Sequence, residues 1–181
     1  MPTQHKNITE ADLHEPKGVS TAAVGTFYKA NGTGSGTWSK DPYGFTYFEN
    51  ISTPYTVTYP STYTKIAPTT IAPGVSYLVT EGTNARLTYL GSGEVMDISC
   101  MLSVDQASGA DRDLQFSIYK NGTIVPGSTT IITASTSSKR SLTLSAAVSL
   151  ATNDYIECYV KNNGGSGDVR VYTFSLFLDP H

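Results

Sequence analysis

The sequence predicts an all-β protein, an antiparallel sandwich or barrel that follows an extended N-terminal arm. The first observation is composition, because 25 Thr, 20 Ser and 12 Tyr among 181 residues favour strands over helices. The second is the alternation of apolar and polar residues in segments after residue 75, which is typical of strands with one buried face. The third is the lack of a helical period. This length allows one domain plus an extension.

The arm is expected over residues 1–40, where short apolar pieces are separated by proline and glycine. The glycine-rich run at residues 31–37 predicts a flexible linker, since a phosphate-binding loop needs a preceding strand and a final Gly-Lys-Ser or Gly-Lys-Thr. The arm nevertheless carries Phe27, Tyr28 and the single tryptophan, Trp38, and disordered tails are poor in such residues. We therefore expect the arm to dock on a partner.

The domain that follows is expected over residues 41–181. Its first part, up to residue 73, contains five prolines, which cannot donate to a strand ladder and predict edge strands and extended connections. One short alternating strand is expected there, at residues 55–59. The Asn121-Gly122 pair then predicts a tight hairpin turn, because both residues accept positive φ. About eight strands are expected in all, and the clearest of those after residue 75 have the ranges 96–104, 114–118, 123–125, 142–150, 155–161 and 168–178.

The last of these segments has apolar residues on both faces. One face is lined by Tyr172, Phe174, Leu176 and Leu178, and the other by Val169, Val171 and Phe177. An antiparallel strand normally leaves one face to water, so this pattern indicates a subunit contact on the outer side. The alternative is a strand buried between the sheet and the arm of the same chain.

No catalytic constellation is present in the sequence. The three histidines, His5, His14 and His181, lie in the arm or at the last residue, outside the strands that would hold a catalytic base rigidly. Sequence motifs of hydrolases, zinc proteases and dinucleotide-binding proteins are absent. We therefore expect no enzymatic activity, no cofactor and no required metal.

Three aspartates and two cysteines offer weaker signals. Asp105, Asp111 and Asp113 flank one presumed loop, where they could bind calcium, although a solvated turn closed by Arg112 explains them more simply. Cys100 and Cys158 lie on the apolar sides of their strands and are expected to be buried as small hydrophobes. A disulfide between them requires that the two strands oppose each other.

The charge pattern excludes several partners. The formal net charge is −3 without a basic cluster, so a direct nucleic-acid partner is not expected. No apolar run approaches the roughly 20 residues of a membrane helix, and the first residues lack the apolar segment of a signal peptide. Membrane insertion and secretory export are therefore not expected.

Two parts of the sequence resemble proteins of tailed bacteriophages. The arm, from Ile8-Thr9-Glu10 through Leu13-His14-Glu15-Pro16-Lys17-Gly18 to Trp38, resembles the N-terminal segment of head-fibre and capsid-decoration (cement) proteins and of some tail fibres. Residues 55–178 are similar to a phage version of the tumour necrosis factor-like jelly roll. The stretches 83–89, 118–123 and 150–159 carry this likeness, with Asn153-Asp154 where the family usually has Gly-Asp. Asn at this place is compatible with positive φ.

The resemblance implies an antiparallel jelly-roll sandwich that forms a homotrimer and decorates the exterior of a virion capsid. Its partners would be itself and the major capsid protein. The residues expected to bind the capsid are Leu13, His14, Pro16, Val19, Val24, Phe27, Tyr28 and Trp38. The residues expected at the trimer interface are Tyr155, Tyr159, Tyr172, Phe174 and Phe177. The alternative function is a tail-fibre tip that recognises a host surface glycan, although the chain shows no repeat or heptad from which a shaft is built.

Overall fold

The computed structural model of the chain describes residues 22–23, 26–30, 36–68, 72–74, 76–82, 84–163 and 167–181. Every regular element within these ranges is a β-strand. The chain divides into two compact units, Met1–Asp41 and Pro42–His181. We describe each unit by itself.

The described part of the first unit contains an antiparallel hairpin of β1 (Phe27–Ala30) and β2 (Gly36–Ser39). Tyr28 lies opposite Trp38, and their rings meet edge to face with centroids 5.5 Å apart. Gly36 pairs with Ala30 and allows the strands to approach, since a Cβ atom there would clash with the carbonyl oxygen of Lys29. Gly36 and Thr37, the last two residues of the glycine-rich run, thus belong to a paired strand, whereas residues 31–35 of the predicted linker lie outside the described residues.

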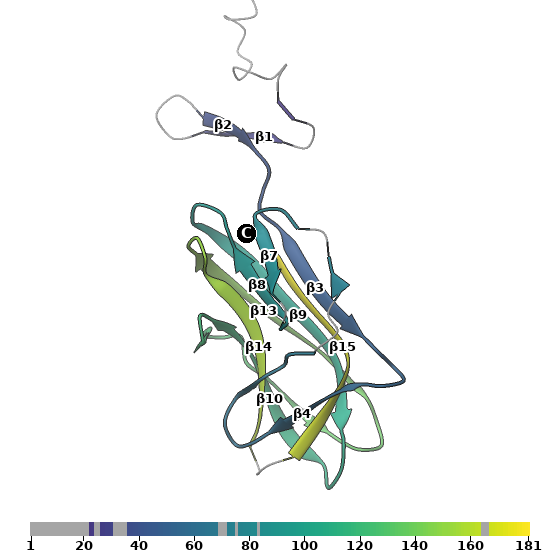
Figure 1. Cartoon of the computed structure of the whole chain (residues 1–181). Helices are drawn as coiled ribbons and strands as arrows, with labels where there is room; N and C mark the ends of the chain where they lie inside the picture. Colours follow the sequence, from purple (N-terminus) through teal and green to yellow (C-terminus); the bar gives the residue numbers. More distant parts are fainter. Residues whose placement is uncertain are drawn as a thin grey trace, which may run out of the picture. The chain divides into compact units, whose positions relative to one another are not determined.

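The second unit contains two antiparallel sheets that face each other (Figure 1). The six-stranded sheet has the order β13 (Arg140–Leu150), β9 (Glu94–Gln106), β15 (Gly167–Pro180), β3 (Gly44–Glu49) and β6 (Ala72–Pro73), with β4 (Tyr55–Tyr59) also paired to β15. The last strand of the unit, β15, is thus an inner strand, held by β9 on one side and by β3 and β4 on the other.

The seven-stranded sheet is built around β14. Its order is β11 (Thr123–Ile124), β10 (Arg112–Lys120), β14 (Tyr155–Asn162), β8 (Arg86–Tyr89) and β7 (Val79–Gly82), with β12 (Thr130–Ala134) also paired to β10 and β5 (Thr64–Lys65) also paired to β14. The prediction of an antiparallel sandwich is therefore confirmed.

The core lies between the two sheets and follows the predicted alternation. On β9 the inward side chains are those expected from the sequence, and all are at most 2% exposed: Met96, Ile98, Cys100, Leu102 and Val104. Cys100 and the β14 residue Cys158 are both fully buried and free, as small core hydrophobes. Burial and the neighbouring Cys158 thiol raise the pKa of Cys100 well above its usual value.

Two tight turns lie where the sequence placed them. Asn121 (φ 51°) and Gly122 (φ 76°) form the turn between β10 and β11, and Asn153 (φ 72°) precedes β14. Asp154 connects the two turns, because its carboxylate accepts hydrogen bonds from the Ala151 backbone N–H (2.7 Å) and from Asn121 Nδ2 (2.6 Å). Both predictions of positive φ are confirmed.

A β-bulge at Tyr172 changes the phase of β15. Val171 pairs with Val104 and Thr173 with Ser103, so Tyr172 is an extra residue opposite β9. Before the bulge Val169 and Val171 face the core, and after it the inward residues are Phe174, Leu176 and Leu178. The prediction that this strand has two apolar faces is therefore wrong, because the bulge turns most of its apolar side chains to the same side.

Candidate functional site

Five of the eight residues predicted to bind a capsid, Leu13, His14, Pro16, Val19 and Val24, lie outside the described residues. The other three, Phe27, Tyr28 and Trp38, belong to the β1–β2 hairpin. Tyr28 and Trp38 pack against each other, whereas Phe27 is 37% exposed. Within the hairpin, Phe27 is thus the aromatic side chain best placed to contact a partner.

The five residues predicted for the trimer interface do not share one surface. Phe174 has no exposed surface and belongs to the core, contrary to its assignment. Tyr172 is nearly buried at the bulge. Phe177 lies on the outer face of the six-stranded sheet, whereas Tyr155 and Tyr159 lie on the outer face of the seven-stranded sheet. A single flat interface would not contain all of them.

The outer face of the six-stranded sheet has a central area without charged side chains, which we call the uncharged face. The Phe177 ring stacks on the Phe45 ring with centroids 5.3 Å apart. The Phe45 ring in turn stacks on the Tyr47 ring with centroids 6.0 Å apart. Tyr47 is 37% exposed and Met101 44%. The uncharged face comprises Phe45, Tyr47, Ser99, Met101, Ser103, Thr143, Ser145, Ser175 and Phe177.

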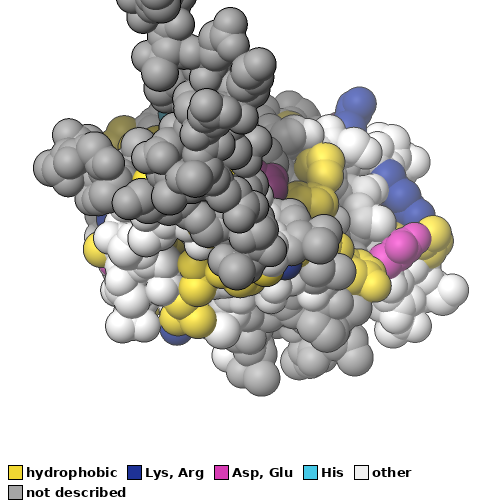
Figure 2. Space-filling view, turned by 90° about the horizontal axis from the view of Figure 1, so that it is seen from above, with side chains coloured by type: hydrophobic (Ala, Val, Ile, Leu, Met, Phe, Trp, Pro, Cys, Tyr) yellow, Lys and Arg dark blue, Asp and Glu magenta, His cyan; other side chains and the backbone are white. Residues whose placement is uncertain are grey.

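Depletion of charge is what sets this area apart. Single exposed hydrophobic residues also occur elsewhere on the unit, for example Leu78 and Leu90, and are ordinary. In the coloured part of Figure 2, hydrophobic side chains form several separate groups among polar ones. The absence of charge together with exposed aromatic and methionine side chains is typical of the central part of protein–protein interfaces.

The outer face of the seven-stranded sheet carries four tyrosines and several charged groups, and we call it the tyrosine face. Tyr119 and Tyr159 stack with centroids 4.1 Å apart, and Tyr63 meets Tyr119 edge to face at 5.5 Å. The Tyr63 hydroxyl lies 2.9 Å from the Ser117 hydroxyl. The tyrosine face comprises Tyr63, Lys65, Arg86, Tyr119, Tyr155, Glu157, Tyr159 and Lys161.

Glu157 is the electrostatic centre of the tyrosine face. Its side chain is 2% exposed and lies 2.5 Å from Lys65 Nζ and 2.7 Å from the Arg86 guanidinium. Burial would raise the pKa of Glu157, but hydrogen bonds from Lys65 and Arg86 outweigh it and lower that pKa. The Tyr159 hydroxyl also donates to Glu157 (3.1 Å), and burial together with this carboxylate raises the pKa of Tyr159 to about 12. The tyrosine face is therefore fixed by charge-assisted hydrogen bonds.

A second buried carboxylate, Asp105, lies beside the bulge. Arg170 donates two hydrogen bonds to it (2.7 and 2.8 Å), and the Tyr172 hydroxyl donates a third (2.8 Å). The bulge thus brings Tyr172 to a charge that would otherwise be under-paired. As expected from the sequence, Asp105 near the end of β9 and Asp113 near the start of β10 flank one loop, which contains Asp111.

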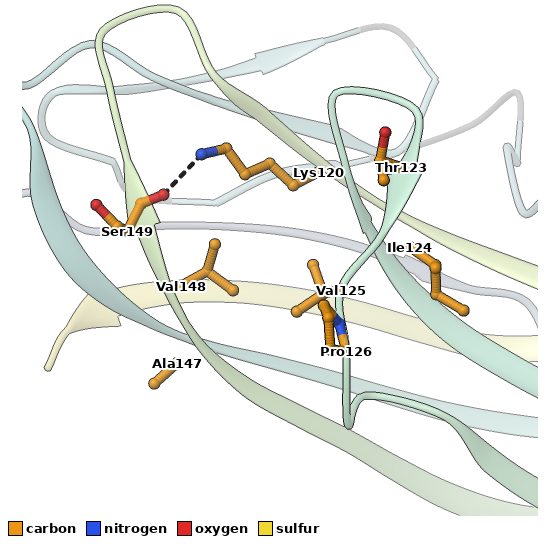
Figure 3. Close-up of a pocket in the computed structure, with 8 residues that line it drawn as sticks. All are labelled: Lys120, Thr123, Ile124, Val125, Pro126, Ala147, Val148 and Ser149. Carbon is orange, nitrogen blue, oxygen red and sulfur yellow. Dashed lines mark hydrogen bonds between the residues drawn. The ribbon is translucent and has the colours of Figure 1, made fainter.

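A cavity of about 440 Å³ lies between the β11 hairpin and β13 (Figure 3). Val125 and Val148 lie opposite each other, and Lys120 donates a hydrogen bond across the opening to the Ser149 carbonyl oxygen (2.7 Å). Lys120 also lies 2.8 Å from Asp154. The Lys120 ammonium group thus links β10 of one sheet to β13 of the other.

A second cavity, of about 420 Å³, is lined by polar groups that include Asp111, Asp113 and Asn162. Asp113 accepts a hydrogen bond from Thr133 (2.7 Å). Among the described residues, no three His, Cys, Asp or Glu side chains are placed to hold a metal ion. The same residues contain no helix of the length and apolarity needed to cross a membrane.

Acid should weaken the second unit, Pro42–His181, through Asp154. Burial would raise its pKa, but hydrogen bonds from Lys120 and the Ala151 backbone lower it from 3.8 to about 2. A carboxyl whose folded-state pKa is depressed stabilises the fold above its unfolded pKa and loses that effect as the pH falls towards the folded value. We expect Asp154→Asn to cost about 1 kcal/mol at pH 7, after allowance for solvent screening.

Urea unfolding of the wild type and of Asp154→Asn between about pH 5 and about pH 2 measures this effect. The two free energies of unfolding should converge as the pH falls below about 4. A difference that stays constant over this range would show that the ionised Asp154 contributes nothing.

Comparison with known proteins identifies the fold of the second unit, which we then call the jelly-roll unit. No family model matches the chain, and no curated protein matches its sequence. The solved structure of the PRD1 vertex protein P5 is similar, with a TM-score of 0.51 and 9% identity over 77% of this chain and 97% of that chain. Murine APRIL has a TM-score of 0.51 and 11% identity over 77% of this chain and 99% of that chain. Eiger TNF from S. frugiperda has a TM-score of 0.49 and 11% identity over 77% of this chain and 94% of that chain. The predicted tumour necrosis factor-like jelly roll is confirmed.

Proposed function

We propose that this chain is a bacteriophage virion structural protein, a homotrimer that decorates the capsid exterior and is attached to the major capsid protein through its N-terminal unit. The observation that supports this most is the likeness of its jelly roll to a phage vertex protein over 97% of that protein's described chain. The role is mechanical, without catalysis or a required metal.

The uncharged face supports self-association. Tyr47 and Met101 are exposed in the single chain, and Phe45 and Phe177 are half-buried beside them. Burying such side chains contributes about 25 cal/mol for each Å² of apolar surface removed from water. A second copy is a suitable partner, because the Ser and Thr hydroxyls around the aromatics place no unpaired charge in the contact. We propose that three copies use this face around a threefold axis.

The N-terminal hairpin supports a docking role. An isolated two-stranded hairpin is marginally stable in water, so binding to a larger surface would provide the cover that it lacks. Phe27 is the exposed aromatic residue of the hairpin, and the Tyr28–Trp38 pair stiffens it. Three such units on one trimer would bind the same particle together, so a modest affinity of each becomes a strong attachment.

Deletion of residues 1–41 tests the attachment. The truncated protein should keep the thermal stability of the jelly roll and lose binding to virus particles, and full-length protein should be present in hundreds of copies in each particle.

Phe27→Ala should weaken binding by about tenfold without altering stability, as expected for loss of one buried aromatic contact. Quantitative mass spectrometry of purified particles and a co-sedimentation assay provide the measurements. Undiminished binding of the truncated protein would place the attachment site on the jelly roll, and a handful of copies would indicate a tail component.

A further inference from the structure

The tyrosine face is a preformed surface that the proposed assembly does not use. It lies on the opposite side of the sandwich from the uncharged face, and its members are fixed by contacts within the chain. The stack of Tyr119 on Tyr159 and the hydrogen bond between Tyr63 and Ser117 hold three rings in place. A ligand that binds here would therefore meet side chains whose conformational entropy is already lost.

The charge of this face is positive, although the chain as a whole has a formal net charge of −3. Lys65, Arg86 and Lys161 contribute three positive charges, and Glu157 contributes one negative charge. Glu157 is 2% exposed, whereas Arg86 is 39% exposed, so a ligand meets the cations first. A second carboxylate, the exposed Asp113, lies at the start of β10, two residues before the partner of Lys161, and accepts a hydrogen bond from Thr133. Three cations against two carboxylates leave the face positive. A partner that bears negative charge is favoured.

Aromatic rings and cations alternate along this surface. The Arg86 guanidinium carbon lies 3.8 Å from the Tyr155 ring centroid, and Lys161 Nζ lies 4.8 Å from that of Tyr63. Tyrosine offers an apolar ring and a hydroxyl together. A sugar ring has the matching chemistry, since its C–H groups form an apolar face and its hydroxyls form a polar rim.

We propose that the tyrosine face binds an acidic polysaccharide of a cell surface, whose carboxylates pair with Lys161 and Arg86 while its sugar rings lie on the tyrosines. Nucleic acid is disfavoured, because strong binding to phosphates usually engages six or more cations and this face has three. A protein partner is disfavoured, because the centres of protein–protein interfaces are depleted of charged residues, whereas this face carries Lys65, Arg86 and Lys161. This inference goes beyond the proposed virion role and does not depend on it.

Calorimetric titration of the full chain with an oligogalacturonate, a chain of carboxylate-bearing sugars, tests the proposal. Binding should weaken as salt is raised from about 50 to about 200 mM, because the contact is partly ionic. Lys161→Glu should lower the affinity at least about tenfold, whereas Lys161→Gln should have a smaller effect.

Lys139→Glu is the matched control. Lys139 Nζ also lies over a tyrosine ring, 3.9 Å from the centroid of Tyr172, but on the other sheet. This variant makes the same change of charge and should bind like the wild type, and circular dichroism establishes that both variants are folded. Four results would each overturn the proposal: no binding of oligogalacturonate, equal loss of affinity in both variants, equal affinity for neutral dextran oligosaccharides, or tighter binding of oligothymidylate.

Discussion

Arg170→Met should lower the free energy of unfolding of the jelly roll by about 3 kcal/mol or more, the usual cost of leaving a buried charge without its partner. Arg170 supplies two of the three hydrogen bonds that the structure gives to Asp105, whose side chain is 6% exposed. Methionine keeps the aliphatic length of the side chain and removes the cation. Urea unfolding at pH 7 measures the change.

Two comparisons identify the cause. Asp105→Leu combined with Arg170→Met should recover most of the loss, because the uncompensated carboxylate is then absent. Lys139→Met removes another cation near Tyr172 and should change stability by less than about 1 kcal/mol, as expected for an exposed cation–π contact. A double variant as unstable as Arg170→Met would mean that lost packing, and not the buried charge, is responsible.

Phe177→Asp should convert the proposed trimer into a monomer. The substitution places a carboxylate at the centre of the uncharged face, where it would be desolvated against Phe45 and a second copy of the chain. Light scattering at micromolar concentration should show the mass fall from about three chains to a single chain of 19.4 kDa.

Tyr155→Asp is the control on the opposite outer face. The new carboxylate would lie beside Arg86, which tolerates it, and the trimer should persist. Dissociation by Tyr155→Asp and not by Phe177→Asp would move the interface to the tyrosine face, as the sequence had suggested for Tyr155 and Tyr159. A wild-type mass of 19.4 kDa would contradict self-association altogether.

The long strands could be predicted from the sequence because alternation and burial coincide in them. The inward side chains of β9 and the turn at Asn121-Gly122 both follow this rule. The bulge at Tyr172 could not be predicted, since one extra residue reverses the alternation without a local marker such as glycine. The apparent second apolar face of β15 was a consequence of this single residue.

Short strands were also missed, for a different reason. β5 and β6 contain two residues each, and their conformation follows from pairing with β14 and β3. The same holds for the β1–β2 hairpin, where a glycine that usually indicates flexibility permits a close strand pair instead. Such elements depend on tertiary contacts more than on local preference.

Only the part of the tyrosine face that lies on β14 could be predicted from the sequence. Tyr155, Glu157, Tyr159 and Lys161 occupy alternate positions of one predicted strand and therefore had to share a face. Lys65 and Arg86, which neutralise Glu157, come from β5 and β8, and no spacing in the sequence connects them to β14. The charge of this face thus became apparent only with the strand order.

The position of β15 determines when this protein is able to fold during synthesis. β3, β4 and β9 all leave the ribosome before their common neighbour exists, so β9 lacks a partner on one side and β3 and β4 lack their main one. The six-stranded sheet can be completed only after residue 180 has emerged. Its completion depends on contacts between parts of the chain that are far apart in sequence, and such contacts form slowly. Until then the exposed strand sides would invite pairing between nascent chains on neighbouring ribosomes. Pausing of translation at any point before β15 has emerged from the ribosome is therefore expected to favour aggregation.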